Sequence, residues 1–223
     1  MKTNRRTFIK TITAGFCAAA GGGYAAQGSS NRLNVGAVGV GGRGWYDWTP
    51  LLEHGENIAA LCDTNRDEIA RGLKFIADKG GDPSRVRTYT DYRKMLDDQS
   101  KLKLDAITVG IPDHSHAPVA ITAMKLGISC YVEKPLVRTL WEADYFRRTA
   151  KECGVVTQMG HQGSASGDFR HNVDVLRSGV LGKVKEIHVW ANSPMWPQGR
   201  DAAVRAGKAP EDPPAALDWD NWL

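Results

Sequence analysis

The sequence is poor in the residues that cross-link a fold or bind a metal. It has four cysteines in 223 residues, and none of them forms a Cys-x-x-Cys motif. Only three of the four follow residue 30, which is an odd number. These counts favour neither a disulfide framework nor a zinc site, so we expect no metal centre. Cys62 and Cys130 stand in apolar runs, where a buried and unreactive side chain is the expected interpretation.

Beyond its first thirty residues the chain also lacks net charge. The whole sequence carries a formal charge of +4, from 29 Lys and Arg against 25 Asp and Glu. Lys2, Arg5, Arg6 and Lys10 account for this excess, since no acidic residue stands among the first thirty. A nucleic-acid-binding domain carries its basic excess as a patch on the folded body. We therefore expect no nucleic-acid partner.

The sequence has little that resembles a membrane span. The apolar stretch Thr11–Ala26 is interrupted by Gly15 and by Gly21–Gly23, and it is too short to cross a bilayer. Together with the preceding Arg5-Arg6 pair it resembles an export signal of the twin-arginine type. We predict a signal peptide over residues 1–30, read by the twin-arginine export machinery, and a periplasmic or otherwise exported mature protein without membrane attachment. The alternative is a cytosolic N-terminus with a chance Arg-Arg pair.

The chain after residue 31 alternates short apolar runs with helical segments. The apolar runs predict six strands, at Leu33–Val38, Ile58–Cys62, Val86–Tyr89, Leu104–Val109, Ile128–Val132 and Val155–Met159. The segments between them predict helices at Trp45–His54, Asn65–Lys79, Asp91–Asp98, Ser115–Leu126 and Leu140–Cys153. Alternation at this spacing predicts an α/β fold with a doubly wound parallel sheet, a Rossmann domain, over residues 31–160.

A different pattern follows residue 160. Phe169–Arg177 predicts a helix, Val184–Ala191 predicts a strand with alternating faces, and the last thirty residues show no clear period. About sixty residues with one helix and one strand are too few for an independent hydrophobic core. We interpret residues 161–223 as the incomplete start of an α+β second domain, in which the strand is an unpaired edge.

The first predicted strand leads into a glycine-rich loop that ends in a helix. The loop reads Gly39-Val40-Gly41-Gly42-Arg43-Gly44, a G-x-G-x-x-G motif in the context that dinucleotide-binding sites require. In that motif Gly39 permits a tight turn, Gly41 admits a pyrophosphate and Gly44 lets the helix pack closely. Arg43 fits a phosphate contact or a solvent-facing position equally well.

Asp63 follows the second predicted strand, nineteen residues after Gly44. A carboxylate at this place can accept hydrogen bonds from both hydroxyls of the adenosine ribose, and it would repel a 2′-phosphate. We therefore expect NAD as the cofactor rather than NADP, although the nearby Arg66 softens that preference. The alternative for Asp63 is an ordinary loop or helix-capping residue.

Two polar loops follow the fourth and fifth predicted strands, at the sheet edge where such folds bind ligands. One contains His116, which fits either a polar residue at a helix start or a cofactor contact. The other is Glu133-Lys134-Pro135. A Lys in a desolvated cleft can transfer a proton or hold a substrate hydroxyl as a cation, so Lys134 is the candidate catalytic residue. A surface loop Lys is the alternative.

Taken in order and spacing, these elements resemble the Gfo/Idh/MocA oxidoreductases, which include glucose–fructose oxidoreductase and inositol dehydrogenase. The resemblance rests on the glycine loop, Asp63, Pro112-Asp113-His114-Ser115-His116 and Glu133-Lys134-Pro135, and it covers residues 33–223. It implies hydride transfer between a sugar or polyol carbon and nicotinamide, with Lys134 beside the reacting hydroxyl. It also implies that Glu133 lies near the nicotinamide ribose and that the loop with Pro112, Asp113 and His116 lines the cofactor.

The resemblance extends to the C-terminal part of the chain. The segments Trp196-Pro197-Gln198-Gly199 and Leu217–Leu223 are similar to those of an exported subgroup from environmental bacteria. His161 and Gln162, after the sixth predicted strand, either face the substrate or form a plain turn.

The family also carries an Asp and a His in its second domain that complete a proton relay. No Asp-x-x-x-His pair follows Glu133-Lys134-Pro135 here, so we expect a C-terminally truncated form of a longer protein. Three functions stay open: an NAD-dependent sugar or polyol oxidoreductase, an NAD-dependent glycosidase of the same family, and, for this chain alone, a non-catalytic dinucleotide-binding module. The family usually associates through its second domain, so we expect the full-length protein to be a homo-oligomer.

Overall fold

A computed structural model describes residues 32–190 and 212–222. The predicted signal peptide, residue Ala191 and the segment Trp196-Pro197-Gln198-Gly199 lie outside the described residues. The described chain divides into two units, the first comprising residues 32–160 and 215–222 and the second residues 161–190 and 212–214. Within these ranges no helix combines the length and the apolar character that crossing a bilayer requires.

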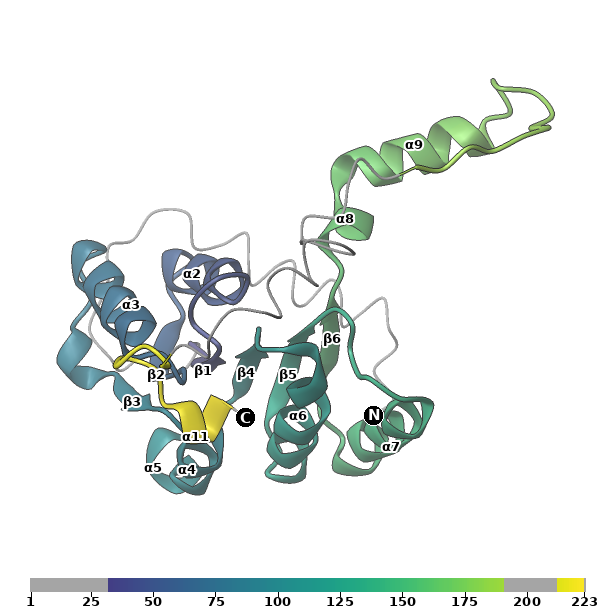
Figure 1. Ribbon diagram of the computed structural model, residues 1–223. Helices are drawn as coiled ribbons and strands as arrows, with labels where there is room; N and C mark the ends of the chain where they lie inside the picture. Colours follow the sequence, from purple (N-terminus) through teal and green to yellow (C-terminus); the bar gives the residue numbers. More distant parts are fainter. Residues whose placement is uncertain (1–31, 191–211, 223) are drawn as a thin grey trace. The chain divides into compact units, whose positions relative to one another are not determined.

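The first unit is built on a six-stranded sheet in which every pair of neighbouring strands is parallel (Figure 1). Its strand order is β3-β2-β1-β4-β5-β6. The strands are β1 Asn34–Val38, β2 Asn57–Cys62, β3 Arg87–Tyr89, β4 Ala106–Val109, β5 Ser129–Glu133 and β6 Thr157–Gly160. The predicted doubly wound α/β fold is thereby confirmed. The order reverses between β1 and β4, and in such sheets ligands bind at that point, outside the carboxyl ends of the strands.

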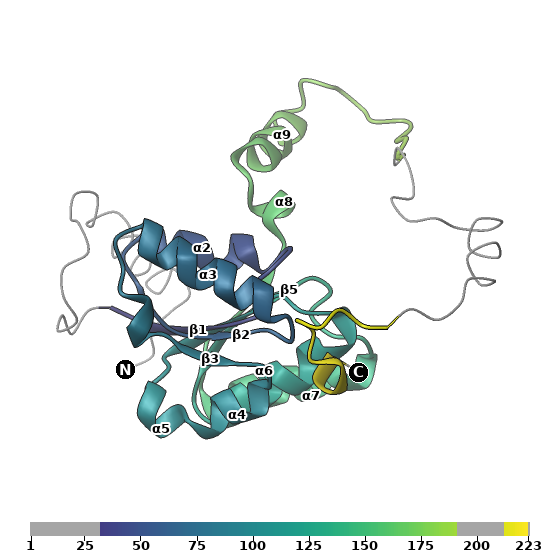
Figure 2. The same cartoon turned by 60° about the vertical axis from the view of Figure 1, so that its left-hand side comes forward.

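Helices cover both faces of the sheet (Figure 2). One face carries α2 (Trp45–Glu53) and α3 (Arg66–Asp78), and the other carries α4 (Tyr92–Asp97), α6 (His116–Lys125) and α7 (Leu140–Cys153). Four single turns complete the first unit, at η1 Pro83–Arg85, α5 Gln99–Leu102, η2 Asp113–Ser115 and α11 Trp219–Trp222. Helix α5 was not predicted, because four residues are too few to show a helical period.

Local side-chain signals start and end the helices close to the predicted places. The Asn65 side chain accepts a hydrogen bond from the Asp67 amide and so begins α3, as predicted. Helix α7 begins with a capping box between Thr139 and Glu142 and ends at Gly154, which has a φ of 67°. These contacts satisfy backbone groups that would otherwise lack partners at the helix ends.

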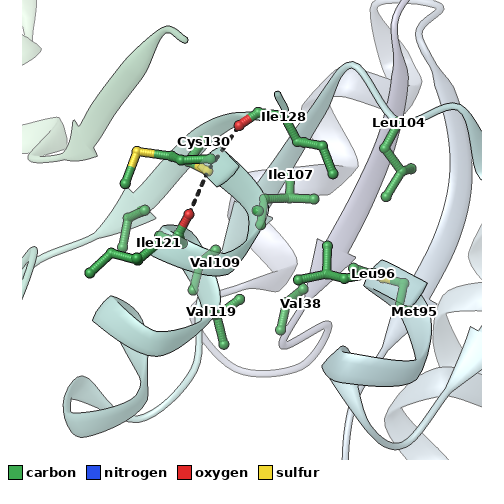
Figure 3. Close-up of a cluster of buried hydrophobic side chains, with 14 of the residues drawn as sticks. Val38, Met95, Leu96, Leu104, Ile107, Val109, Val119, Ile121, Ile128 and Cys130 are labelled. Atoms are coloured by element: carbon green, nitrogen blue, oxygen red, sulfur yellow. Dashed lines mark hydrogen bonds between the residues drawn. The ribbon is translucent and has the colours of Figure 1, made fainter. Parts of the chain in front are cut away.

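Each face of the sheet has its own hydrophobic core. Trp48 and Leu61 are fully buried on the face of α2 and α3. On the other face Val38, Ile107 and Cys130 pack together beneath α4 and α6 (Figure 3). Burial raises the pKa of the Cys130 thiol to about 12, so this side chain stays protonated and acts as a small apolar residue, as predicted.

The second unit contains α8 (Gln162–Ala165) and α9 (Gly167–Arg177). None of its described residues is buried, so these residues form no hydrophobic core. The predicted strand over Val184–Ala191 is wrong for its described part, because residues 184–190 adopt no regular secondary structure. The alternating pattern alone does not make a strand, since a strand needs a neighbour to accept its backbone hydrogen bonds, and the described residues place none beside it.

Candidate cofactor and active site

The glycine loop forms where three backbone segments touch. Gly39, at the end of β1, has a φ of 79°. A Cβ atom added to Gly44, before the first turn of α2, would lie 1.9 Å from the Gly39 carbonyl oxygen. A Cβ added to Gly110, just after β4, would lie 2.5 Å from the Gly44 Cα. The roles predicted for Gly39 and Gly44 therefore agree with the structure, and Gly110 is a third member that the motif did not include.

The remaining glycines of the loop differ from each other. A Cβ on Gly42 would meet no atom within 4 Å, so no other part of the described chain covers this side of the loop. A Cβ on Gly41 would meet the flexible Glu68 side chain at 2.6 Å. The expected approach of Gly41 to a pyrophosphate stays a prediction. From the core side, the buried Trp48 indole donates a hydrogen bond of 3.1 Å to the Val40 carbonyl oxygen and so fixes the loop.

Asp63 connects the end of β2 to the glycine loop. Its Oδ2 accepts hydrogen bonds from the Val40 amide at 2.8 Å and the Gly41 amide at 3.3 Å. Its Oδ1 accepts a hydrogen bond of 2.9 Å from the Asn65 amide. The structure thus shows the loop-holding role that was the alternative for Asp63, and the ribose-binding role stays a prediction.

A pocket of about 320 Å³ opens at the carboxyl ends of β1, β2 and β4. Gly39, Asp63 and Pro112, three of the predicted cofactor residues, line it together with Ile111. Its volume lies at the lower end of the range of small-molecule sites. The Asp63 carboxylate can accept hydrogen bonds from ribose hydroxyls, and the apolar side chains of Ile111 and Pro112 can pack against a base. The residues of the pocket therefore fit the adenosine half of a dinucleotide.

Arg43, Glu133 and Asp47 form a partly buried charge cluster. The Arg43 Nε lies 3.0 Å from Glu133 Oε1, and its Nη2 lies 3.8 Å from Asp47 Oδ1. The Arg43 side chain is 46% exposed, whereas both carboxylates are buried. Neither alternative considered for Arg43 included this ion pair, which joins the glycine loop to the end of β5.

Asp47 is a titratable group that the sequence analysis missed. Burial, followed by the repulsion of the nearby Glu133 carboxylate, raises the pKa of Asp47 to about 7, and the Arg43 cation opposes this shift. Its two carboxylate oxygens are buried without a hydrogen-bond partner among the described residues. The sequence could have indicated that Asp47 is buried, because it stands directly before Trp48 in a predicted helix. In the structure Asp47, Trp48 and Thr49 are all buried on α2.

His116 connects the two polar loops. Its ring is buried, with Nδ1 2.6 Å from the Pro135 carbonyl oxygen and Nε2 2.8 Å from that of Ile111. The structure therefore gives this side chain a positioning role between the loops, and the cofactor contact that the resemblance implies stays a prediction.

The other predicted site residues of these loops and of the second unit are exposed. The Lys134 side chain is exposed, so the desolvated cleft expected around it is not present among the described residues. The peptide bond that follows it, Lys134–Pro135, is cis. Asp113 is exposed in η2, and His161 and Gln162 are exposed at the start of the second unit.

A parallel sheet of order 3-2-1-4-5-6, with a glycine loop after β1 and an acid after β2, defines a dinucleotide-binding domain. Comparison with known families then places the chain more narrowly. Residues 33–161 match the Gfo/Idh/MocA oxidoreductase family, NAD-binding Rossmann fold, and the chain belongs to this family.

Individual relatives have low sequence identity to this chain. A glycosyl hydrolase family 109 protein of Shewanella sp. (strain W3-18-1) is 30% identical over 159 residues, which are 68% of this chain and 33% of that protein. The chain thus spans about a third of the length of the curated relatives it matches.

Solved structures share the fold. Myo-inositol 2-dehydrogenase from Lactobacillus plantarum superposes with a TM-score of 0.59 at 24% identity, over 69% of this chain and 43% of that one. Scyllo-inositol dehydrogenase from Lactobacillus casei, solved with NAD(H) and scyllo-inositol bound, gives a TM-score of 0.57 at 17% identity, over 68% and 42%.

The glycine contact predicts a steric effect on stability. Gly44→Ala forces the backbones of β1 and α2 apart, so we expect the free energy of unfolding to fall by about 1–3 kcal/mol or more. Urea unfolding followed by circular dichroism measures this loss. Gly163→Ala, where an added Cβ meets no atom within 4 Å, serves as the control and should change stability little. Equal stability of the two variants would contradict the contact.

The buried Asp47 predicts a pH-dependent stability. An acid whose pKa is higher in the folded than in the unfolded state binds its proton more tightly when folded, so the free energy of unfolding falls as pH rises from about 4 to 7. Asp47→Asn removes this contribution and should stabilise the protein at pH 8 by about 1 kcal/mol or more, because a buried charge is removed. Denaturant midpoints between pH 4 and 8 measure it, with the exposed Asp97→Asn as control. Parallel pH profiles of Asp47→Asn and the unmodified chain would refute this account.

Proposed function

We propose that the first unit binds NAD and serves as the cofactor domain of an oxidoreductase acting on a sugar, polyol or related hydroxyl compound. Family membership supports dehydrogenase chemistry in general terms. The observation that carries the choice of cofactor is the Asp63 carboxylate, which lines the pocket beside the glycine loop. A negative charge at that place favours a ribose with a free 2′-hydroxyl over one with a 2′-phosphate.

The residues of this chain divide the work of binding and proton transfer. The glycine loop and the start of α2 would hold the phosphates, with backbone amides and the positive end of the helix dipole. Asp63 would accept hydrogen bonds from the ribose hydroxyls. NAD, when bound, supplies the hydride acceptor. Lys134, directly after β5, holds the substrate hydroxyl and takes part in moving its proton, and closure of a second domain over it would supply the desolvation that this role needs.

The proposed substrate class and location rest on indirect support. Two solved structures of the same fold are dehydrogenases of inositols, which favours a polyol or a sugar. The residues of the chain correspond to only about a third of the curated relatives, so the reaction is proposed for the protein with a complete substrate domain. We propose that the protein is exported, because residues 1–30 resemble a twin-arginine signal. We also propose that the full-length protein is a homo-oligomer, because members of the family usually associate through their second domain.

A second candidate is an NAD-dependent glycosidase. The curated relatives are named glycosyl hydrolase family 109 proteins, at 28–30% identity. In such an enzyme oxidation of the sugar is transient, and the cofactor is restored within each turnover. The two candidates share the cofactor site and differ in their net products, which makes them separable by one assay.

Asp63 predicts the cofactor preference. We expect Asp63→Ala to weaken NAD binding about tenfold, because charged hydrogen bonds are lost, and to improve the tolerance of NADP relative to NAD. Asp63→Asn keeps an oxygen that can accept the loop amides and should change mainly the NADP tolerance. Calorimetric titrations of both cofactors measure these effects, with Asp97→Ala as control. An unchanged ratio of the two affinities in both variants would argue against the ribose role.

The proposed role of Lys134 predicts that its removal lowers turnover but not NAD binding. In the full-length protein, Lys134→Ala should retain NAD binding within about threefold and lose turnover by about a hundredfold or more. The assay offers NAD with a panel of polyols and chromogenic glycosides. Accumulating NADH identifies a dehydrogenase, and chromophore release without net NADH identifies a glycosidase. Equal loss of binding and turnover would mean that Lys134 belongs to the cofactor site instead.

A further inference from the structure

Residues 215–222, here called the C-terminal segment, fold back onto the cofactor-binding unit. The Arg66 amide donates a hydrogen bond of 2.9 Å to the Ala216 carbonyl oxygen. The Asp218 amide donates one of 2.7 Å to the carbonyl oxygen of Thr64. Between them Asn65 and Leu217 form an antiparallel β-bridge. Although the sequence pattern placed residues 161–223 in one region, this segment therefore pairs with the chain immediately after Asp63.

Side chains fix the same segment on its other side. The Arg93 Nη2 at the start of α4 donates a hydrogen bond of 3.0 Å to Asn221 Oδ1, and Asn221 Nδ2 donates one of 3.0 Å to Asp218 Oδ2. Hydrogen bonds from the side chains of Asn221 and Thr90 lower the pKa of Asp218. Figure 1 shows α11 (Trp219–Trp222, yellow) beside α4. The segment is thus held to the loops after both β2 and β3.

The segment supplies part of the pocket that Asp63 lines. Asp220, Asn221 and Trp222 face the same cavity as Asp63 and Pro112. The Trp222 ring is stacked on Trp219, with ring centroids 5.4 Å apart and planes 6° from parallel. The Trp222 side chain is 43% exposed, so one part of the ring contacts Trp219 and another part is open to a ligand. A partly exposed aromatic ring that lines a pocket of about 320 Å³ suits a flat heterocyclic base.

We propose that the C-terminal segment is the outer wall of the adenosine end of the dinucleotide site, and that Trp222 stacks on the adenine ring. The inference rests on the proposed function, since it assumes that the pocket beside Asp63 holds the adenosine half. It goes further by assigning a binding residue that lies outside the motifs of the Rossmann domain. Stacking of a base on an aromatic side chain contributes enough to make its removal visible as a change in affinity.

The test uses the whole chain and ADP-ribose, which carries the adenosine and both phosphates without nicotinamide. We expect Trp222→Ala to weaken ADP-ribose binding about tenfold in calorimetric titrations. Trp222→Phe keeps a stacking face and should stay within about threefold of the unmodified chain. Trp141→Ala is the matched control, because Trp141 on α7 is also exposed and stacked on an aromatic ring, that of Tyr145, and does not line the pocket. Thermal unfolding of each variant establishes that the fold is intact.

Each outcome decides a different point. Loss of affinity in Trp222→Ala, with Trp222→Phe and Trp141→Ala near the original value, supports the proposal. Unchanged affinity in Trp222→Ala overturns it while leaving the proposed function standing. Loss in both Trp222 variants, to the same degree, overturns stacking and assigns Trp222 to docking of the segment. A chain that binds neither NAD nor ADP-ribose overturns the proposed function, and this inference with it.

Discussion

The contact between the backbones of Gly39, Gly44 and Gly110 is the constraint on which the rest of this structure depends. It lets α2 begin directly against the ends of β1 and β4, at distances that any side chain would prevent. The switch point of the sheet and the start of the helix therefore coincide, and the loop between them has its open side at Gly42. The buried Trp48 indole and the Asp63 carboxylate then hold this loop from two directions.

Beyond the loop, polar groups that are buried or partly exposed connect the parts of the site to one another. Arg43 reaches from the glycine loop to Glu133 at the end of β5, and the buried Asp47 lies beside that pair. The His116 ring bridges the carbonyl groups of Ile111 and Pro135. In a low-dielectric setting such contacts are strong when they are satisfied and costly when they are not. The loops that flank Lys134 are thus positioned by polar contacts that hydrophobic packing alone would not specify.

Much of the first unit was predictable because its signals are local. The apolar runs predicted all six strands of the sheet, and Asn65 marked the start of α3. The glycine motif and Asp63 were recognisable because their spacing reflects one continuous strand–loop–helix–strand path.

Other features could not be predicted because they depend on contacts between distant parts of the chain. The strand predicted over Val184–Ala191 is not formed in its described part, since a strand depends on a neighbour that the alternating pattern does not specify. The Arg43–Glu133 pair, whose residues stand 90 positions apart, depends on the tertiary fold and left no local pattern. The hydrogen bond from Arg93 to Asn221 also depends on the tertiary fold and left no local pattern. The single turn of α11 was too short to show a helical period.

The C-terminal segment also bears on the order in which the protein forms. Its hydrogen bond from Arg93 to Asn221 closes a loop of 128 residues, whereas the parallel strands of the sheet are joined through far shorter crossovers. Contacts between residues that are distant in sequence cost more chain entropy to form and usually form late. During synthesis the ribosome releases residues 215–222 only after the whole sheet has been made. The sheet and its helices can therefore assemble before this wall of the pocket exists, and the pocket reaches its final shape as one of the last events of folding.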